Sequence, residues 1–297
     1  MKMMKAIVCT KYGTPDVLQL QEVKQPLPKA KQLLIRVQAT AVNSADLRLR
    51  KAEPWAVRLA FGLTKPRLPI LGGVFAGIVE KIGSEVQQFA IGDKVFGTTG
   101  MTMGAYGEYI CVPEGGCIAV IPENMDFVQA AAVPFGAMTA LHFLNKAQLQ
   151  KGETVLIYGA SGAVGSAAVQ FAKASGAEVT AVCSSANTSL VQSLGADHVI
   201  DYAQEDFNSH TKRYDVVFET VNKLPFAQCK RLVQNEGRLI LGAAGLADML
   251  RGAWSDKTNR MKVLSGLAQE KKEDLLYTKE LIENGHYAAP RINLPSF

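Results

Sequence analysis

The stretch TVLIYGASGAVGSAAVQFAKASGAEVTAVC, residues 154–183, places three glycines between a short β-branched run and an Ala-rich run, with a second β-rich run behind them. Glycine in the first position permits a tight turn, in the second a close approach of a phosphate, and in the third close packing of helix on strand. The start of the helix adds N–H groups and the positive end of its dipole. The stretch therefore predicts a dinucleotide-binding strand–turn–helix unit. The residues predicted to bind are Gly159, Ser161, Gly162, Ala163 and Val164, with Gly165 as the packing glycine.

Single helical patterns separate further strand-like runs after residue 153, namely EVTAVC, HVIDY, YDVVFETV and GRLILGAA. This alternation is typical of a doubly wound parallel sheet with right-handed crossovers. From residue 5 to about residue 122, short β-like runs broken by Gly and Pro instead predict a mostly antiparallel β domain. Between the two lies an Ala-rich stretch, which we expect to be helical after Pro122 and interrupted at Pro134.

Length and composition predict an ordinary globular protein of two domains, because 297 residues exceed what one core usually supports. The net charge of +5 is spread along the chain, which disfavours a nucleic-acid face. The five cysteines are odd in number and form no CxxC pair, so we expect a reducing, cytoplasmic compartment. No stretch approaches the length expected of a membrane span, so no membrane partner is predicted.

The end of the second strand bears on cofactor choice, because NAD enzymes usually place Asp or Glu there to bind the ribose hydroxyl. Residues 183–187 read CSSAN, without a carboxylate. Ser184 and Asn187 can donate hydrogen bonds to a 2′-phosphate, which favours NADPH over NADH. The alternative is that this polar loop simply caps the helix beginning near Asn187, and the two interpretations are compatible.

Several segments in a fixed order resemble the medium-chain dehydrogenase/reductase superfamily, in its zinc-free quinone-oxidoreductase branch. They are MKAIVCTKYGTPDVLQL, VQATAVNSADLRLR, FAGIVEKIGSEVQQFAIGDKVFG, AYGEYICVP, AAAVPFGAMTALHFL, the glycine motif and SLGADHVIDY. The resemblance implies a GroES-like catalytic domain at 1–122, a Rossmann NADP-binding domain at 123–262, and a C-terminal segment, 263–297, that returns to the catalytic domain. It also implies a homodimer formed through the Rossmann sheet.

The zinc-dependent members of this superfamily hold zinc with Cys, a Gly-His-Glu segment and a later Cys or His. In this chain Ser44–Asp46 lie where the first Cys is expected, and Gly73 and Val74 lie in the His-Glu place. The usual zinc donors are therefore missing, and we predict that no metal is bound. Without a Lewis acid, simple alcohol oxidation is disfavoured, whereas a quinone or enone accepts hydride with only a hydrogen bond to the developing oxyanion.

The resemblance also assigns candidate site residues, each with a structural alternative. Asn43 is a candidate donor to the oxyanion or to the nicotinamide ribose, or else a turn residue, and Asp46 either anchors this region or caps the following helix, which we favour. Thr139 is expected near the nicotinamide half and Tyr202 near the adenosine phosphate, unless they are a helix hydroxyl and a strand aromatic. Val221 and Gly242 follow later strands, as cofactor contacts or only as turn residues.

Other positions depart from the family pattern or carry no clear chemistry. Arg48 stands where quinone reductases commonly have Tyr, and Asn222 replaces a common glycine. Residues 45–65 are either a lid over a pocket or a solvated amphipathic helix. The four histidines show no metal-like spacing, and we expect them to be structural.

The chain ends in AAPRINLPSF where relatives continue through further strands, so we expect a truncated product with reduced thermal stability. Three functions follow from the sequence. The first is NADPH-dependent reduction of a quinone or a similar activated carbonyl acceptor. The second is NADPH-dependent reduction of an enone or alkenal double bond. The third is cofactor binding with little catalysis.

Overall fold

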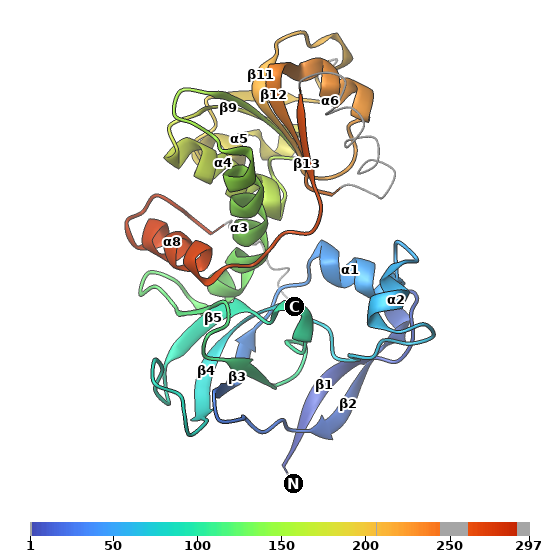
Figure 1. The fold of residues 1–297 in the computed structure, drawn as a ribbon, viewed down its shortest axis with the longest axis vertical. Helices are drawn as coiled ribbons and strands as arrows, with labels where there is room; N and C mark the ends of the chain where they lie inside the picture. Colours follow the sequence, from blue (N-terminus) through green and yellow to red (C-terminus); the bar gives the residue numbers. More distant parts are fainter. Residues whose placement is uncertain (1, 206, 244–260, 290–297) are drawn as a thin grey trace. The chain divides into compact units, whose positions relative to one another are not determined.

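The computed structural model describes residues 2–205, 207–243 and 261–289 of the chain (Figure 1). They form two compact units. The first contains the described residues up to Phe135 together with Glu270–Glu283. The second contains those of Gly136–Gln269 and Asn284–Pro290. The chain therefore returns near its C-terminus to the unit formed by its N-terminal part. Of the C-terminal stretch AAPRINLPSF, which we interpret from the sequence as a truncated tail, residues 290–297 lie outside the described residues.

The first unit is built on a five-stranded antiparallel sheet with the order β6-β3-β4-β5-β7. Its strands are β3 (Gln32–Ala39), β4 (Val74–Ile82), β5 (Lys94–Thr98), β6 (Tyr109–Pro113) and β7 (Ile118–Val120). A separate antiparallel hairpin pairs β1 (Met3–Cys9) with β2 (Leu18–Lys24). Apolar side chains on one face of the large sheet, including Leu33, Phe75 and Val95, form the core. The predicted mostly antiparallel β domain is confirmed.

Short helices complete this unit: α1 (Ser44–Lys51), α2 (Val57–Phe61) and the 3-10 turns η1 (Pro15–Val17) and η2 (Gly100–Thr102). The segment predicted as a lid or a solvated helix thus forms two short helices, between which Trp55 is 64% exposed. Helix α8 (Lys272–Glu283), in the returning C-terminal segment, is connected to the rest of this unit by side-chain hydrogen bonds. Asn124 Nδ2 donates to the carbonyl of Ile282 at 3.0 Å, and Lys272 Nζ donates to Gln88 Oε1 at 2.8 Å.

Helix α3 (Phe127–Ala147) is continuous and contains Pro134, so the predicted interruption at this proline is wrong. Proline removes one hydrogen bond from a helix, but burial of the surrounding alanines and of Val133 and Met138 holds this helix together. The helix also corrects the expectation that no stretch approaches the length of a membrane span. Its mean hydropathy is 1.4 over an 18-residue window, although 61% of that window is buried inside the protein, as in a core helix.

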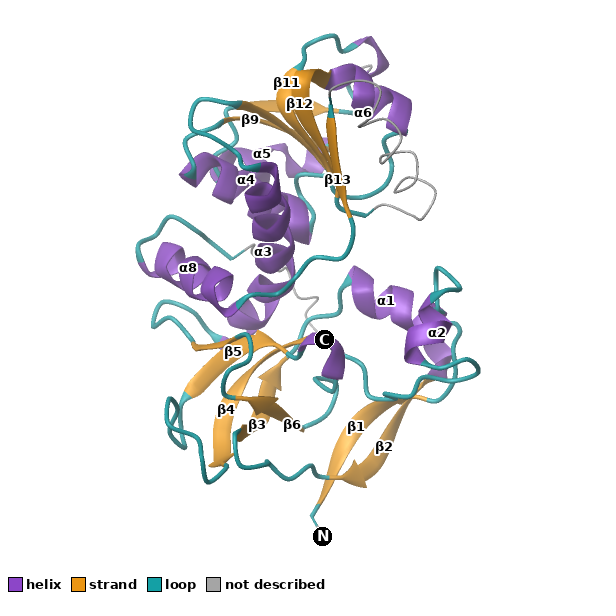
Figure 2. Cartoon of the chain, viewed as in Figure 1, coloured by secondary structure: helices purple, strands orange, loops and turns teal. Residues whose placement is uncertain are grey.

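The second unit is a six-stranded parallel sheet with the order β10-β9-β8-β11-β12-β13 (Figure 2). The strands are β8 (Thr154–Tyr158), β9 (Glu178–Cys183), β10 (His198–Asp201), β11 (Tyr214–Glu219), β12 (Val233–Leu241) and β13 (Lys262–Ser265). The intervening helices are α4 (Ala163–Ala174), η3 (Ser185–Asn187), α5 (Thr188–Ser193), η4 (Phe207–Ser209) and α6 (Phe226–Leu232). The strand order reverses between β8 and β11, which is where ligands bind in doubly wound sheets. The predicted Rossmann-type sheet is confirmed.

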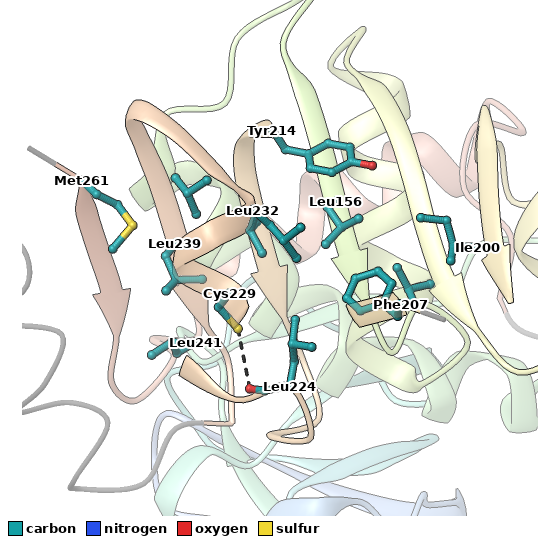
Figure 3. Packing of buried hydrophobic residues seen from close by; sticks show 13 residues of the cluster. Leu156, Ile200, Phe207, Tyr214, Leu224, Cys229, Leu232, Leu239, Leu241 and Met261 are labelled. Atoms are coloured by element: carbon teal, nitrogen blue, oxygen red, sulfur yellow. Dashed lines mark hydrogen bonds between the residues drawn. The ribbon is translucent and has the colours of Figure 1, made fainter. Parts of the chain in front are cut away.

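Both faces of this sheet are covered, with α4 and α5 on one side and α6 on the other (Figure 1). On the α6 side, Leu156, Leu232 and Leu239 pack in one buried cluster with Cys229, whose Sγ lies 3.6 Å from the carbonyl oxygen of Leu224 (Figure 3). Because the sheet is covered on both faces, a central strand such as β8 is mostly apolar and buried along its length.

Candidate dinucleotide-binding site

The glycine turn joins β8 to α4 at the carboxyl edge of the parallel sheet. Gly159 has φ of +80°, a left-handed conformation that favours glycine. A Cβ atom there would lie 2.7 Å from both Thr220 Oγ1 and a methyl carbon of Val221. At Gly165 a Cβ would lie 2.2 Å from the carbonyl oxygen of Gly159. Gly159 and Gly165 therefore have the turn and packing roles expected of the first and third glycines.

Gly162 differs from these two glycines because the space beside it is open. It is the N-cap of α4, with φ −76° and ψ 169°, and no side chain caps the helix there. A Cβ at Gly162 would meet only the carbonyl oxygen of Gly159, at an ordinary 3.4 Å. Gly162 and Ala163 are exposed, and Ser161 and Val164 are half-buried. This open cradle at a helix N-terminus fits the pyrophosphate of a dinucleotide.

Helix α3 packs directly against the start of α4. A Cβ at Gly136 would lie 2.2 Å from the carbonyl oxygen of Ala163, so only glycine allows this approach. Thr139 is half-buried one turn further along α3. Within the described residues its hydroxyl has no hydrogen bond, so the alternative of a hydroxyl bonded to its own helix backbone is not found.

The loop after β9 holds the predicted 2′-phosphate contacts. Asn187 Nδ2 donates to Ser184 Oγ at 3.0 Å, and the Asn187 N–H donates to the Ser184 carbonyl at 2.9 Å. Asn187 is the N-cap of α5 by position, but its side chain makes no capping bond. Ser184 and Asn187 are brought together and are half-buried, with polar atoms that can face a ligand.

A carboxylate that the sequence interpretation overlooked lies beside this loop. Asp201, the last residue of β10, is the cross-strand partner of Cys183. Its Oδ1 accepts a hydrogen bond from the Ala203 N–H at 2.9 Å, which ties the carboxylate into its own turn. Burial, followed by the negative charge of Asp201, raises the pKa of the Cys183 thiol. Strand pairing was needed to find Asp201, since it lies 18 residues beyond Cys183 in the chain.

Tyr202 follows β10 at the same edge and is 49% exposed. Its ring stacks on that of Tyr158, with centroids 6.4 Å apart and planes 26° from parallel. Its N–H donates to the carbonyl of Cys183 at 3.2 Å. Tyr202 therefore presents a partly exposed aromatic face next to the loop of Ser184, rather than being a strand residue.

The turn after β11 forms the opposite wall of the glycine loop. Val221 is 41% exposed and its methyl groups occupy the space in front of Gly159. Gly242, after β12, donates its N–H to the carbonyl of Glu219 at 2.9 Å. The sequence singled out Val221 and Gly242, but it missed Glu219, whose buried carboxylate organises this turn.

Asn43 and Asp46 lie in the first unit and form a capping box at the start of α1. Asn43 Oδ1 accepts from the N–H groups of Ala45 and Asp46 at 2.8 and 3.2 Å, and Asp46 Oδ2 accepts from the Asn43 N–H at 3.1 Å. Asp46 Oδ1 also accepts from the Gly72 N–H at 3.2 Å. Burial raises the pKa of the Asp46 carboxyl. The favoured cap role of Asp46 is present, and both Asn43 and Asp46 support the helix start.

Two further features concern metal binding and the histidines. Among the described residues, no group of three or more His, Cys, Asp or Glu side chains is arranged to hold a metal ion. A pocket of about 280 Å³ in the second unit is lined by Ile200, Glu205, Phe207, Ser209 and His210. The His210 ring stacks on Phe207, its Nε2 lies 2.9 Å from Tyr214 Oη, and burial lowers its pKa. These contacts give His210 a packing role.

Comparisons with known proteins agree with this architecture. Residues 29–123 match the alcohol dehydrogenase GroES-like domain, and residues 163–267 match the zinc-binding dehydrogenase family. The chain is 36% identical to tomato (Solanum lycopersicum) 2-methylene-furan-3-one reductase, over 74% of this chain and 58% of that protein. It is 34% identical to the chloroplastic NADPH-dependent alkenal/one oxidoreductase of Arabidopsis thaliana, over 82% of this chain and 63% of that protein. It thus spans about three-fifths of these two plant relatives.

A pig (Sus scrofa) quinone oxidoreductase is 35% identical over 81% of this chain and 73% of its own length. The solved structure of a quinone oxidoreductase from Coxiella burnetii superposes with a TM-score of 0.86 at 30% identity, covering 99% of this chain and 91% of the other. A GroES-like sheet combined with a doubly wound nucleotide-binding sheet defines a class of dehydrogenases and reductases. The chain belongs to the medium-chain dehydrogenase/reductase superfamily, in its quinone-oxidoreductase-like branch.

Proposed function

We propose that this protein is a zinc-independent, NADPH-dependent oxidoreductase that transfers hydride to a quinone or a similarly activated carbonyl acceptor. The observation that carries the proposal is the open glycine cradle at Gly162, at the switch point of the parallel sheet. The quinone oxidoreductases among its relatives support the acceptor class.

NADPH is the proposed cofactor because of the loop after β9. Ser184 and Asn187 lie together there, and residues 183–187 include no carboxylate to repel a 2′-phosphate. Asp201 lies nearby, but it is tied into the Ala203 turn. The NADPH-dependent relative from Arabidopsis thaliana supports the same choice. When bound, NADPH supplies a hydride, and a proton from solvent completes reduction of the acceptor.

Asn43 is the proposed hydrogen-bond donor to the acceptor oxyanion. Its Oδ1 faces two backbone N–H groups, which assigns the amide orientation, and its Nδ2 has no partner among the described residues. The side chain can therefore cap α1 and donate from Nδ2 at the same time. Such a donor stabilises the negative charge that develops on the acceptor oxygen during hydride transfer.

We propose that the protein works without zinc because of the residues that stand where zinc-dependent members of the superfamily have their zinc ligands. Ser44 and Gly73 offer no thiolate or imidazole, and both carboxylate oxygens of Asp46 already accept backbone hydrogen bonds. The purified protein is therefore expected to keep its activity after dialysis against a chelator. Loss of activity that returns on addition of zinc would contradict this part of the proposal.

An enone or alkenal reductase is the second candidate, favoured by the tomato and Arabidopsis relatives that act on such compounds by name. One experiment separates the candidates. NADPH and NADH are titrated by fluorescence, and oxidation of each is then followed with 1,4-benzoquinone and with a simple alkenal. Faster NADPH oxidation with the quinone supports the first proposal and faster oxidation with the alkenal supports the second. Binding without turnover supports a non-catalytic cofactor-binding protein, and no binding overturns all three.

A further inference from the structure

Glu219, the last residue of β11, is 2% exposed although it carries a carboxylate. This carboxylate accepts hydrogen bonds from three successive backbone N–H groups, those of Val221 at 3.3 Å, Asn222 at 2.7 Å and Lys223 at 3.0 Å. A buried charge is costly unless it is hydrogen-bonded, and these donors compensate it. The side chain therefore organises the turn that follows its own strand.

The turn held by Glu219 lies directly against the glycine loop. Thr220 Oγ1 donates to the carbonyl of Tyr158 at 2.8 Å, so the turn is bonded to the end of β8. The Val221 methyl groups fill the position that a side chain at Gly159 would take, 2.7 and 3.1 Å from its ideal Cβ. Val221 is still 41% exposed, so its other side faces outward beside the loop.

The shortest of the three hydrogen bonds comes from the N–H of Asn222, and the backbone of this residue has a positive φ angle. Asn222 has φ of +56°, in the left-handed region that glycine adopts more readily. The hydrogen bond from the Asn222 N–H to the Glu219 carboxylate helps to hold Asn222 in this conformation. Without the Glu219 carboxylate, we expect the turn to relax and the Val221 side chain to move away from Gly159.

We propose that Glu219 is a positioning residue of the cofactor site, which holds the 220–223 turn so that Val221 stays against Gly159 as a fixed apolar wall. This inference rests on the proposed function, because the wall serves a bound dinucleotide. Glu219 touches neither cofactor nor acceptor in this account. It acts only through the backbone of Val221, Asn222 and Lys223.

The test uses the full chain and the variants E219Q, E219A, N222G and E219A/N222G. In E219Q the shape is kept, but an NH₂ group replaces one acceptor oxygen and faces backbone donors. The matched control is E178Q, because Glu178 begins β9 at the opposite edge of the same sheet and its side chain is 43% exposed. For each protein, the Kd for NADPH, the KM for NADPH, kcat with 1,4-benzoquinone and the thermal midpoint are measured.

E219Q is expected to raise the Kd and KM for NADPH about tenfold, since small misplacements of a binding group have effects of this order or more, while kcat changes less than about twofold. Adding N222G to E219A is expected to recover much of the lost affinity, because glycine adopts the left-handed turn without the carboxylate. E178Q is expected to bind NADPH like the wild type.

Wild-type Kd and KM in E219Q and E219A, with only a lower thermal midpoint, would overturn the positioning role and leave the proposed function standing. Equal loss in E219A and E219A/N222G would also overturn it, because the carboxylate would then not act through the turn. Failure of the wild type to bind NADPH would instead overturn the proposed function itself. The wild-type titration separates failure of the proposed function from failure of the positioning role, and the variants then test the positioning role itself.

Discussion

Asn43 shows how one side chain serves both the fold and the proposed chemistry. Its amide oxygen accepts from two N–H groups at the start of α1, and the carboxylate of Asp46 accepts from the Asn43 N–H. This capping box satisfies donors that a helix N-terminus leaves unpaired. Only the amide nitrogen remains for chemistry, so capping and oxyanion stabilisation can be separated by substitution.

Asn43→Ser is expected to keep the helix cap and to lose the proposed donor. Serine caps as well as asparagine, so the thermal midpoint should stay close to that of the wild type. The value of kcat is expected to fall about a hundredfold, as when one oxyanion donor is removed. Asn43→Ala should lose both functions and about 1 kcal/mol of stability. A wild-type kcat in the serine variant would exclude Asn43 as the donor.

Ser184→Asp is expected to convert the cofactor preference. A carboxylate at the end of β9 repels a 2′-phosphate and can bind a ribose 2′-hydroxyl. We expect the ratio of kcat/KM for NADPH to that for NADH to fall by a factor of ten or more, on the order of 1.4 kcal/mol. Gln192→Glu, at an exposed position of α5, adds the same charge as a control and should leave the ratio unchanged. An unchanged ratio in S184D would place the 2′-phosphate elsewhere.

At the scale of elements, the β8–α4 turn uses its three glycines for different purposes. Gly159 and Gly165 are required by contacts within the fold, whereas Gly162 borders open space. The distinction comes from where a Cβ atom would point. The motif spacing alone assigns these roles by analogy, and the contacts show that they hold in this chain.

Gly162→Ala and Gly165→Ala are therefore expected to behave differently. At Gly165 the new methyl group would lie 2.2 Å from the Gly159 carbonyl, so α4 must move and stability should fall by several kcal/mol, as on overpacking of a core. At Gly162 the methyl group fits the fold, with a loss below about 1 kcal/mol from the poorer N-cap. The methyl group would occupy the side of the turn where the cofactor pyrophosphate is proposed to bind, so the Kd for NADPH should rise more than about tenfold. Thermal unfolding and fluorescence titration of both variants test this difference, and unchanged NADPH binding in G162A would contradict the cradle.

The whole molecule carries five cysteines, and none forms a disulfide within the described residues. Burial raises the pKa of Cys111 to about 11 and that of Cys117 to about 12, and it also raises the pKa of Cys9 and Cys183. Thiolates are the reactive form, so the raised pKa values lower the reactive fraction of these side chains. The reducing, cytoplasmic compartment stays a proposal.

The folded protein is therefore expected to react slowly with Ellman's reagent at pH 8, and faster as the pH rises toward 11, because the raised pKa values delay ionisation. After denaturation, all five thiols should react at once. Rapid reaction of several thiols in the folded protein would contradict the burial described for them. The denatured sample serves as the control, because it gives the total number of thiols that can react.

We also expect a homodimer formed through the edge of the parallel sheet. In the described residues β13 pairs with β12 on one side only, and an unpaired strand edge is a ready site for pairing with a second chain. Light scattering after size exclusion should give twice the chain mass of 32.0 kDa. A single-chain mass at all concentrations tested would contradict the dimer.

The amino-acid sequence by itself determined the alternation of strands and helices, the glycine turn and the capping of α1, because these depend on residues close together in the chain. It misjudged α3, since the packing that keeps Pro134 within a continuous helix comes from distant segments. The pairing of Asp201 with Cys183 and the contact of the turn held by Glu219 with Gly159 were decided only by the tertiary structure. Strand pairing brings such groups together from distant positions, and burial then gives a carboxylate at a strand end a role that its local sequence does not reveal.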